Sequence, residues 1–254
     1  MGLSLLHLPE RTAKPRNAGL TMVMDKGLSL RQAEDLVSMS SASVDFIKLG
    51  FGTSLVTPCL KEKIKLYEAA GIQPYLGGTL FEAALIRNQL QDYVAFCKSL
   101  NLKVIEVSDG SIQMNHIEKC NIIKSLSADF KILSEVGSKE VGVIIHPSRW
   151  IKMMSSELEA GAFKVIAEAR ESGTVGIFHK NGNAHKILIQ RITQKVRVED
   201  IIWETPLKAQ QVYFIKLLGA NANLGNIAPE EVIALETLRL GLRGDTFHHF
   251  LPNL

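Results

Sequence analysis

The chain has 254 residues, of which 46% are hydrophobic and 22% are charged. This is enough apolar material for a substantial core, and α/β barrels of roughly 250 residues commonly form one domain. The formal net charge of +3 comes from 29 basic and 26 acidic residues, spread along the chain without a basic block. That balance indicates neither a nucleic-acid partner nor a membrane partner.

The compartment is predicted from the cysteines and the N-terminal segment. Three widely spaced cysteines without a C-x-x-C pair are typical of reduced thiols. No run reaches the roughly 18 apolar residues of a membrane span, and the N-terminus lacks the basic start of a secretion signal. We therefore expect a soluble cytoplasmic protein, and the sequence leaves its oligomeric state open.

Short β-type runs alternate with amphipathic stretches along nearly the whole chain. The expected strands cover residues 20–24, 44–49, 73–76, 104–107, 131–135, 163–167, 201–204 and 220–224. The expected helices cover residues 30–39, 58–70, 80–99, 115–127, 148–160, 183–195, 206–218 and 229–241. This alternation indicates βα units around a parallel sheet.

The repeated units, without a linker or a low-complexity tract, predict a single (βα)₈ TIM barrel over residues 1–254. Residues 1–17 would form an N-terminal extension and residues 248–254 a short tail. An open doubly wound sheet is the alternative, because barrel closure is not visible in one sequence. The first βα turn lacks the G-x-G-x-x-G fingerprint, which disfavours a dinucleotide site.

Four apolar runs each end in a carboxylate followed by a turn, namely VIEVSDG (104–110), ILSEVGSK (132–139), VIAEARESG (165–173) and IIWETP (201–206). The carboxyl ends of parallel strands meet at one mouth of a barrel, so acids there could bind a hard cation such as Mg²⁺. The candidate metal ligands are Glu106, Asp109, Glu135 and Glu204. A strand-end acid taken alone could equally cap a helix or pair with a lysine.

The turns after the first three strands combine cations, glycines and hydroxyl groups. Glycine exposes backbone N–H groups and threonine can donate a hydrogen bond, so an anionic small molecule suits this rim, although each glycine could simply serve a tight turn. Lys48 lies inside the apolar run DFIKLGFG, where it must reach the mouth or meet a buried carboxylate. The candidate binding residues here are Lys26, Lys48, Thr53, Gly78 and Thr79.

Later turns add further candidates. Arg170 follows the sixth expected strand, and its guanidinium suits a carboxylate or phosphate. Asn223 and Asn226 lie in the passage NANLGNIAPEEV (221–232), which joins the eighth expected strand to the last helix, near where barrels commonly bind phosphate. Lys139, four residues after Glu135, could act as a proton donor over a ligand, although a lysine there could equally be a surface residue.

In collinear order, from Lys14 to Phe247, the sequence motifs resemble those of the phosphosulfolactate synthase family. They are KPRNAGLTMVMDKG, FIKLGFGTS, GGTLFE, IEVSDGS, LSEVGSK, EARESG, WETPLKAQQ, NLGNI and ALETLRLGLRGDTF. The chain departs from the family pattern at Phe51, where tryptophan is usual, at Ser138, where a lysine often stands, and at Gly225, where alanine is usual.

The resemblance implies a (βα)₈ barrel that uses Mg²⁺ to add sulfite to phosphoenolpyruvate, giving (2R)-phospho-3-sulfolactate. Lys139 matches the proposed acid/base lysine of the family. Lys26, Lys48 and Arg170 would then hold sulfite or the substrate carboxylate, and the Asn223–Asn226 turn would take the phosphate. The product could lead to coenzyme M or to sulfolactate.

Two alternatives keep the same barrel. One is another Mg²⁺-dependent lyase acting on a phosphorylated three-carbon acid. The other is a non-enzymatic, stress-associated or structural relative.

Overall fold

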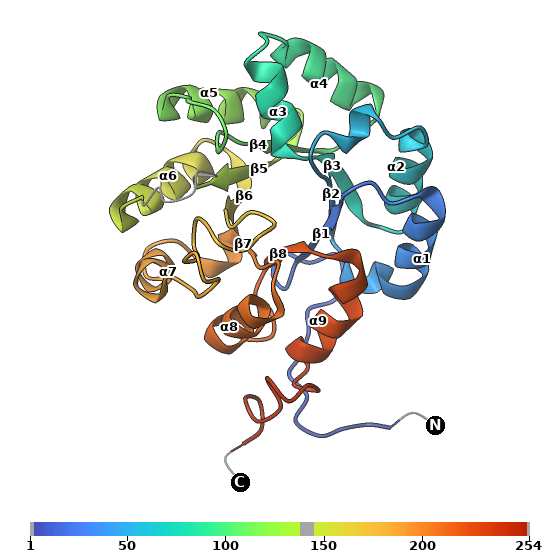
Figure 1. Ribbon diagram of the computed structural model, residues 1–254, viewed down its shortest axis with the longest axis vertical. Helices are drawn as coiled ribbons and strands as arrows, with labels where there is room; N and C mark the ends of the chain where they lie inside the picture. Colours follow the sequence, from blue (N-terminus) through green and yellow to red (C-terminus); the bar gives the residue numbers. More distant parts are fainter. Residues whose placement is uncertain (1–2, 138–144, 253–254) are drawn as a thin grey trace.

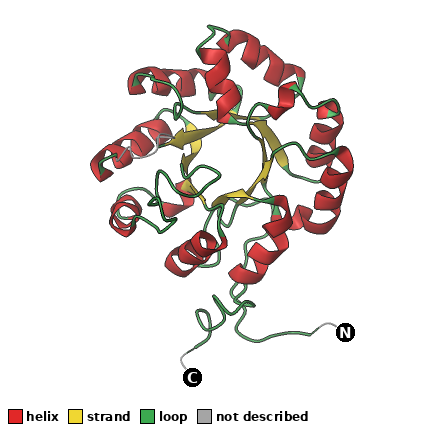
Figure 2. Cartoon of the chain, in the orientation of Figure 1, coloured by secondary structure: helices red, strands yellow, loops and turns green. Residues whose placement is uncertain are grey.

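The strands form a nearly closed barrel in the computed structural model, which describes residues 3–137 and 145–252. One parallel sheet has the strand order β3-β2-β1-β8-β7-β6-β5-β4, and Figure 2 shows its ring of strands enclosed by helices. The strands are β1 (Thr21–Asp25), β2 (Phe46–Leu49), β3 (Gln73–Leu76), β4 (Val104–Val107), β5 (Lys131–Val136), β6 (Ala162–Ala167), β7 (Ile201–Glu204) and β8 (Leu224–Ile227). The predicted (βα)₈ barrel is confirmed.

The helices cover the outside of this ring (Figure 1). They are α1 (Leu30–Ser40), α2 (Leu60–Ala69), α3 (Gly78–Leu85), α4 (Leu90–Ser99), α5 (His116–Leu126), α6 (Pro147–Glu159), α7 (Lys186–Thr193), α8 (Lys208–Leu218) and α9 (Val232–Arg239). The single helix predicted over residues 80–99 is wrong, because α3 ends before Asn88, whose positive φ of 57° interrupts the helical path. No helix in the described part of the chain is long and apolar enough to cross a membrane.

Side chains alternate between the barrel interior and the helices, as the pleat of a strand requires. The interior layer consists of buried apolar side chains: Leu20, Met22, Phe46, Tyr75, Val104, Leu133, Ile166 and Ile202. Outward residues such as Ile47 and Trp203 belong instead to the core under the helices. A residue two positions after an interior one therefore points inward again, closer to the carboxyl end of the barrel.

The eighth strand lies later in the chain than the sequence predicts. The prediction placed it over residues 220–224, whereas β8 begins at Leu224. Gly219 ends α8 with φ of 86°, and the Asn223 side chain then accepts a hydrogen bond from Leu20 N at 3.0 Å and donates one to Ile201 O at 3.1 Å. Asn223 thus fixes the start of the strand.

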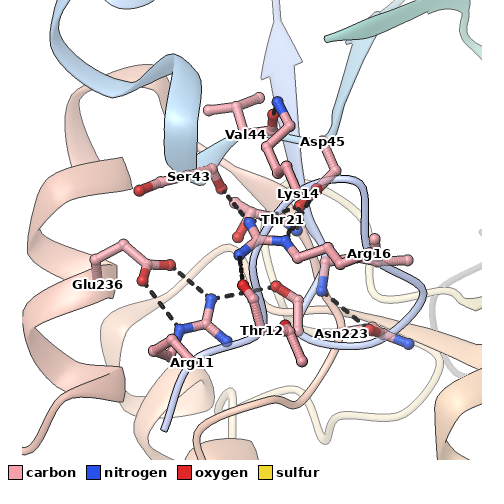
Figure 3. A network of polar contacts seen from close by, with 12 residues as sticks. Arg11, Thr12, Lys14, Arg16, Thr21, Ser43, Val44, Asp45, Asn223 and Glu236 are labelled. Carbon is pink, nitrogen blue, oxygen red and sulfur yellow. Dashed lines mark hydrogen bonds and ion pairs between the residues drawn. The ribbon is translucent and has the colours of Figure 1, made fainter. Parts of the chain in front are cut away.

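The segment before β1 runs across the base of the barrel and is held there by two arginines (Figure 3). Arg16 and Asp45 form a buried ion pair with 2.8 Å between Nη2 and Oδ2, and the same Oδ2 accepts Thr21 N at 2.8 Å. Arg11 binds Glu236 of α9, with 3.0 Å between Nη2 and Oε1. These pairs connect the start of the chain to β1, β2 and α9.

We predict that Arg16→Ala lowers the free energy of unfolding by about 3–5 kcal/mol, because it leaves the Asp45 carboxylate buried without its cation. The exposed pair between Lys98 and Asp129 provides the control, since Lys98→Ala should cost less than about 1 kcal/mol. Urea denaturation of both variants measures the difference. Equal losses of stability for the two substitutions would contradict this role of the Arg16–Asp45 ion pair at the base of the barrel.

Candidate active site

A cavity of about 460 Å³ opens at the carboxyl ends of the strands. Its wall combines acidic, basic and small polar side chains, which suits a compact, highly charged ligand rather than an apolar one. The lining residues are Met24, Lys48, Phe51, Thr79, Ser111, Glu135, Glu168, Arg170, Glu171, Ser172, Glu204 and Asn226.

Lys48 is surrounded by glutamates from three other strands. Its Nζ lies 2.9 Å from Glu106 Oε1 of β4, 3.2 Å from Glu135 Oε2 of β5 and 3.6 Å from Glu204 Oε1 of β7. Each of these residues comes two positions after an interior apolar residue, as Lys48 comes after Phe46. The alternation of the strands therefore brings all four charged groups to the same level of the barrel.

Each glutamate is also held by a second donor. Gly78 N donates to Glu106 Oε1 at 2.6 Å, and Ala169 N donates to Glu204 Oε2 at 3.0 Å. The Ser108 hydroxyl donates to Glu135 Oε1 at 2.7 Å. The carboxylates are thus positioned by the backbone and by a buried hydroxyl as well as by the ammonium.

The charge of Lys48 is strongly stabilised. Burial alone would lower the pKa of Lys48, but the attraction of Glu106, Glu135 and Glu204 outweighs it, and the pKa lies well above its usual value. The phenol of Tyr75, on the interior face of β3, has its pKa raised by burial and by the charge of Glu106. Lys48 therefore stays an ammonium and Tyr75 a neutral phenol.

A further acid lies next to this cluster on α3. The Ser108 hydroxyl is hydrogen-bonded to Glu82 Oε1 as well as to Glu135, and Ser111 N donates to Glu82 Oε2 at 3.1 Å. Glu82 thereby connects α3 to the segment after β4, which contributes Ser111 to the cavity wall.

The segment between β6 and α7 supplies Glu168 and Arg170 to the cavity. It folds back tightly, since Ile177 N donates to Glu168 O at 3.1 Å. A Cβ on Gly176 would lie 1.9 Å from the same carbonyl oxygen, so only glycine fits there. From α8, Gln210 Nε2 donates to Gly173 O at 2.7 Å and to Gly182 O at 3.1 Å. These contacts fix the backbone that presents Arg170.

The structure brings many of the predicted site residues together. The cavity wall includes Lys48, Thr79, Glu135, Arg170, Glu204 and Asn226. Glu106 reaches the same cluster through its ion pair with Lys48. Lys26 lies at the rim, where it forms an exposed ion pair with Glu171.

Other predicted residues have different surroundings. Asp109 pairs with Lys119 at 2.9 Å, and it is absent from the described cavity lining. The Thr53 hydroxyl donates to Gly50 O at 2.8 Å, whereas Gly78 gives its N–H to Glu106. The assignment of Asn223 to a phosphate site is wrong, because this residue lies at the opposite end of the barrel, where its side chain binds backbone near the starts of β1 and β7.

The predicted acid/base residue Lys139 lies outside the described residues, as does Ser138. The other two departures from the family pattern lie inside them. Phe51 lines the cavity with φ of 55°. Gly225 faces Met22, whose Cε would be 2.7 Å from an added Cβ, so alanine there would require this methionine side chain to move.

Glu168 is a cavity residue that is absent from the sequence-based candidates. The run VIAEARESG (165–173) is one of the four that end in a carboxylate, but the candidate metal ligands come only from the other three runs, and Glu168 lines the cavity. A signal was present, since Glu168 follows the interior Ile166 by two positions, the spacing that also places Glu106, Glu135 and Glu204.

The donor set suits Mg²⁺ in chemistry, although residues 3–137 and 145–252 contain no ready-made group of three or more metal-binding side chains. Mg²⁺ is usually held by one or two carboxylates together with waters and substrate oxygens, and such sites need no protein cage. The glutamates that reach the cavity wall, Glu135, Glu168 and Glu204, can meet that demand. Asp109 is engaged elsewhere by Lys119.

Comparisons with known proteins match this chain over nearly its full length. A family model for (2R)-phospho-3-sulfolactate synthase matches residues 9–245. The chain is 43% identical over 244 residues to phosphosulfolactate synthase of Methanothermobacter thermautotrophicus, covering 94% of this chain and 95% of that one. It is 41% identical over 245 residues to phosphosulfolactate synthase of Bacillus subtilis, covering 95% and 97%.

Solved structures of other enzymes have the same fold. 3-Hexulose-6-phosphate synthase from Salmonella typhimurium is similar with a TM-score of 0.53 at 15% identity, covering 88% of this chain and 100% of that one. The YdjI aldolase from Escherichia coli has a TM-score of 0.55 at 9% identity, covering 91% and 93%. At these identities the likeness shows the barrel alone.

The segment between β6 and α7, which presents Arg170, makes the stability of the protein depend on pH. The rings of His179 and His185 are 3.4 Å apart between centroids, and burial followed by the charge of His179 lowers the pKa of His185 from 6.5. The unfolded chain therefore binds this proton first, so the contribution of His185 to stability is present above pH 6.5 and is lost as the pH falls through the lower folded value.

We predict that His185→Asn reduces the decrease in melting temperature that acidification below pH 6.5 causes. The exposed His248 supplies the control, since His248→Asn should leave that decrease unchanged. Thermal denaturation across this pH range measures both. A profile for His185→Asn that overlays the wild type would contradict the linkage.

Proposed function

We propose, on the premise that this chain belongs to the phosphosulfolactate synthase family, that it adds sulfite to phosphoenolpyruvate to give (2R)-phospho-3-sulfolactate. The observation that supports this reaction is the similarity to synthases of that name over nearly the full length of each chain. The same similarity identifies the chain as an enzyme of this kind, so the non-enzymatic alternative is not retained.

The carboxylates of the cavity wall support a requirement for Mg²⁺. Both proposed substrates are anions, and Mg²⁺ is usually held by one or two carboxylates together with waters and substrate oxygens. Glu135, Glu168 and Glu204 bring carboxylates to the cavity wall. We propose that these three residues hold Mg²⁺, which would stabilise the carboxylate of the reacting substrate.

The residues of the chain would bind the substrates and stabilise the charge that moves during the reaction. The sulfur lone pair of sulfite forms a bond to C3 of phosphoenolpyruvate, and the π electrons of the C2–C3 bond move through C2 into the carboxylate. The Lys48 ammonium, fixed in the cavity wall, stabilises this developing charge. Arg170 suits a bidentate contact with the carboxylate or the phosphate.

A proton must then reach C2 to complete the product. We assign this step to Lys139, on the match between its SEVGSK motif and the acid/base lysine of the family. Lys48 is poorly suited to the same task, since its raised pKa opposes release of a proton. The two lysines would therefore divide the work, with Lys48 supplying fixed charge and Lys139 supplying the proton.

We predict that the purified protein consumes sulfite and forms an acid-stable organic phosphate when phosphoenolpyruvate and Mg²⁺ are present. Lys139→Ala should lower kcat by about 10²–10⁴ through loss of the proton donor. Lys65→Ala, at an exposed position on α2, is the matched control and should leave kcat unchanged. Chelation of the metal should abolish turnover, and added Mg²⁺ should restore it.

Three results would contradict the proposal. Absence of sulfite consumption at high protein concentration would reject the reaction. Turnover of phosphoenolpyruvate without sulfite would indicate the other lyase that the sequence left open. Undiminished turnover by Lys139→Ala would reject the proton donor alone.

A further inference from the structure

Three glutamates surround the Lys48 ammonium and fix its position. Glu106, Glu135 and Glu204 approach it from separate strands at 2.9, 3.2 and 3.6 Å. The ammonium donates a hydrogen bond to Glu135 Oε2, and Glu106 and Glu204 hold it as ion pairs. Because each carboxylate is also held by a second donor, the ammonium cannot move without breaking several short contacts.

This ammonium lies where the sequence interpretation placed a metal ion. The predicted ligand set contained these same three glutamates. A divalent cation would need Mg²⁺–oxygen distances of about 2.0–2.1 Å to the same oxygen atoms. A divalent cation at the centre of the three glutamates would therefore coincide with the ammonium, and the repulsion between the two positive centres prevents this. Glu135 and Glu204 also reach the cavity wall, where a divalent cation can be bound away from Lys48.

Glu106 differs from Glu135 and Glu204 in its position relative to the cavity. Lys48, Glu135 and Glu204 contribute to the cavity wall, whereas Glu106 is absent from the described lining. Its side chain is fully buried, and Oε1 contacts both Lys48 Nζ and Gly78 N. A Cβ on Gly78 would lie 2.6 Å from this oxygen, so the α3 terminus approaches Glu106 as closely as a glycine allows.

We propose that Lys48 is a built-in cation of the active site, which stabilises negative charge on the substrate, and that Glu106 is a positioning residue for Lys48 and not a metal ligand. The catalytic role of Lys48 rests on the proposed function. The assignment of Glu106 to Lys48, and of other glutamates to a divalent cation, does not rest on it, because it concerns only which cation each glutamate binds. Glu106 serves the ammonium, while a divalent cation binds to acids at the cavity wall.

The first test measures Mn²⁺ binding in the absence of turnover, with the electron paramagnetic resonance signal of the free ion as the readout. Glu106→Gln keeps an acceptor for Gly78 N, and its Mn²⁺ affinity should stay within about threefold of the wild type, whereas loss of a metal ligand or of its hydrogen-bonded support costs about 10–100-fold. Glu62→Gln, at an exposed position on α2, is the control for loss of one negative charge. A Glu106→Gln affinity more than about tenfold weaker than that of Glu62→Gln would overturn the assignment.

The second test removes the ammonium itself. Lys48→Met leaves three carboxylates around an uncharged side chain, so Mn²⁺ affinity should rise at least about tenfold as the repulsion is lost. The double variant Lys48→Met with Glu106→Gln should lose most of that gain. A folded Lys48→Met protein with unchanged or weaker Mn²⁺ binding would overturn the placement of the ammonium at a cation position. If Lys48→Met does not fold, Glu106→Gln and Lys48→Arg provide the decision.

The third test uses the reaction. Lys48→Met should lower kcat by about 10²–10³, the loss expected when a preorganised charge is removed from the transition state. Glu106→Gln should lower kcat by about 10–100-fold with little change in KM, because it acts through Lys48 and does not touch substrate. Lys48→Arg, which keeps the charge, should recover part of the activity. If Lys48→Met retains wild-type turnover, the catalytic role of Lys48 is overturned. If the wild-type protein is itself inactive, the proposed function is rejected, and the Mn²⁺ results alone decide which cation each glutamate binds.

Discussion

The attraction between the Lys48 ammonium and the strand-end glutamates is the interaction on which the active site depends. Four charged groups are taken out of water together, and each would be costly to bury without the others. The cluster is tolerable because every carboxylate also accepts a hydrogen bond from a fixed donor, from Gly78 N, Ala169 N or the Ser108 hydroxyl. Strands β2, β4, β5 and β7 are thereby held in one relative position at the mouth.

Much of this arrangement follows from alternation along the strands, which can be read from the sequence. Phe46, Val104, Leu133 and Ile202 fill the barrel interior, and the residue two positions later carries a charge in every case. The prediction that Lys48 must reach the mouth or meet a buried carboxylate is confirmed on both counts. The barrel class and seven of the strand positions could be predicted for the same reason, since βα units repeat with a clear apolar pattern.

The remaining differences arise where alternation does not apply. Asp109 lies in a turn beyond β4, so its direction depends on Lys119, a helical residue that no strand pattern reveals. Asn223 was predicted to lie at the mouth with Asn226, but its side chain binds the backbone at the base and β8 begins only at the next residue. Asn226 enters the cavity from within β8 through a left-handed backbone conformation, with φ of 57°.

The two ends of the barrel use similar ion pairs for different purposes. At the base, Arg16 and Asp45 are matched one to one, and the aspartate also binds Thr21 N, so the pair connects segments and leaves little charge to offer a ligand. At the mouth, the Lys48 ammonium faces the carboxylates of Glu106, Glu135 and Glu204. Lys48, Glu135 and Glu204 also contribute to the cavity wall, so this ion-pair cluster presents charged groups to the cavity, whereas the pair at the base only joins segments of the chain. The position of Lys48 therefore determines how these glutamates are oriented beside the cavity.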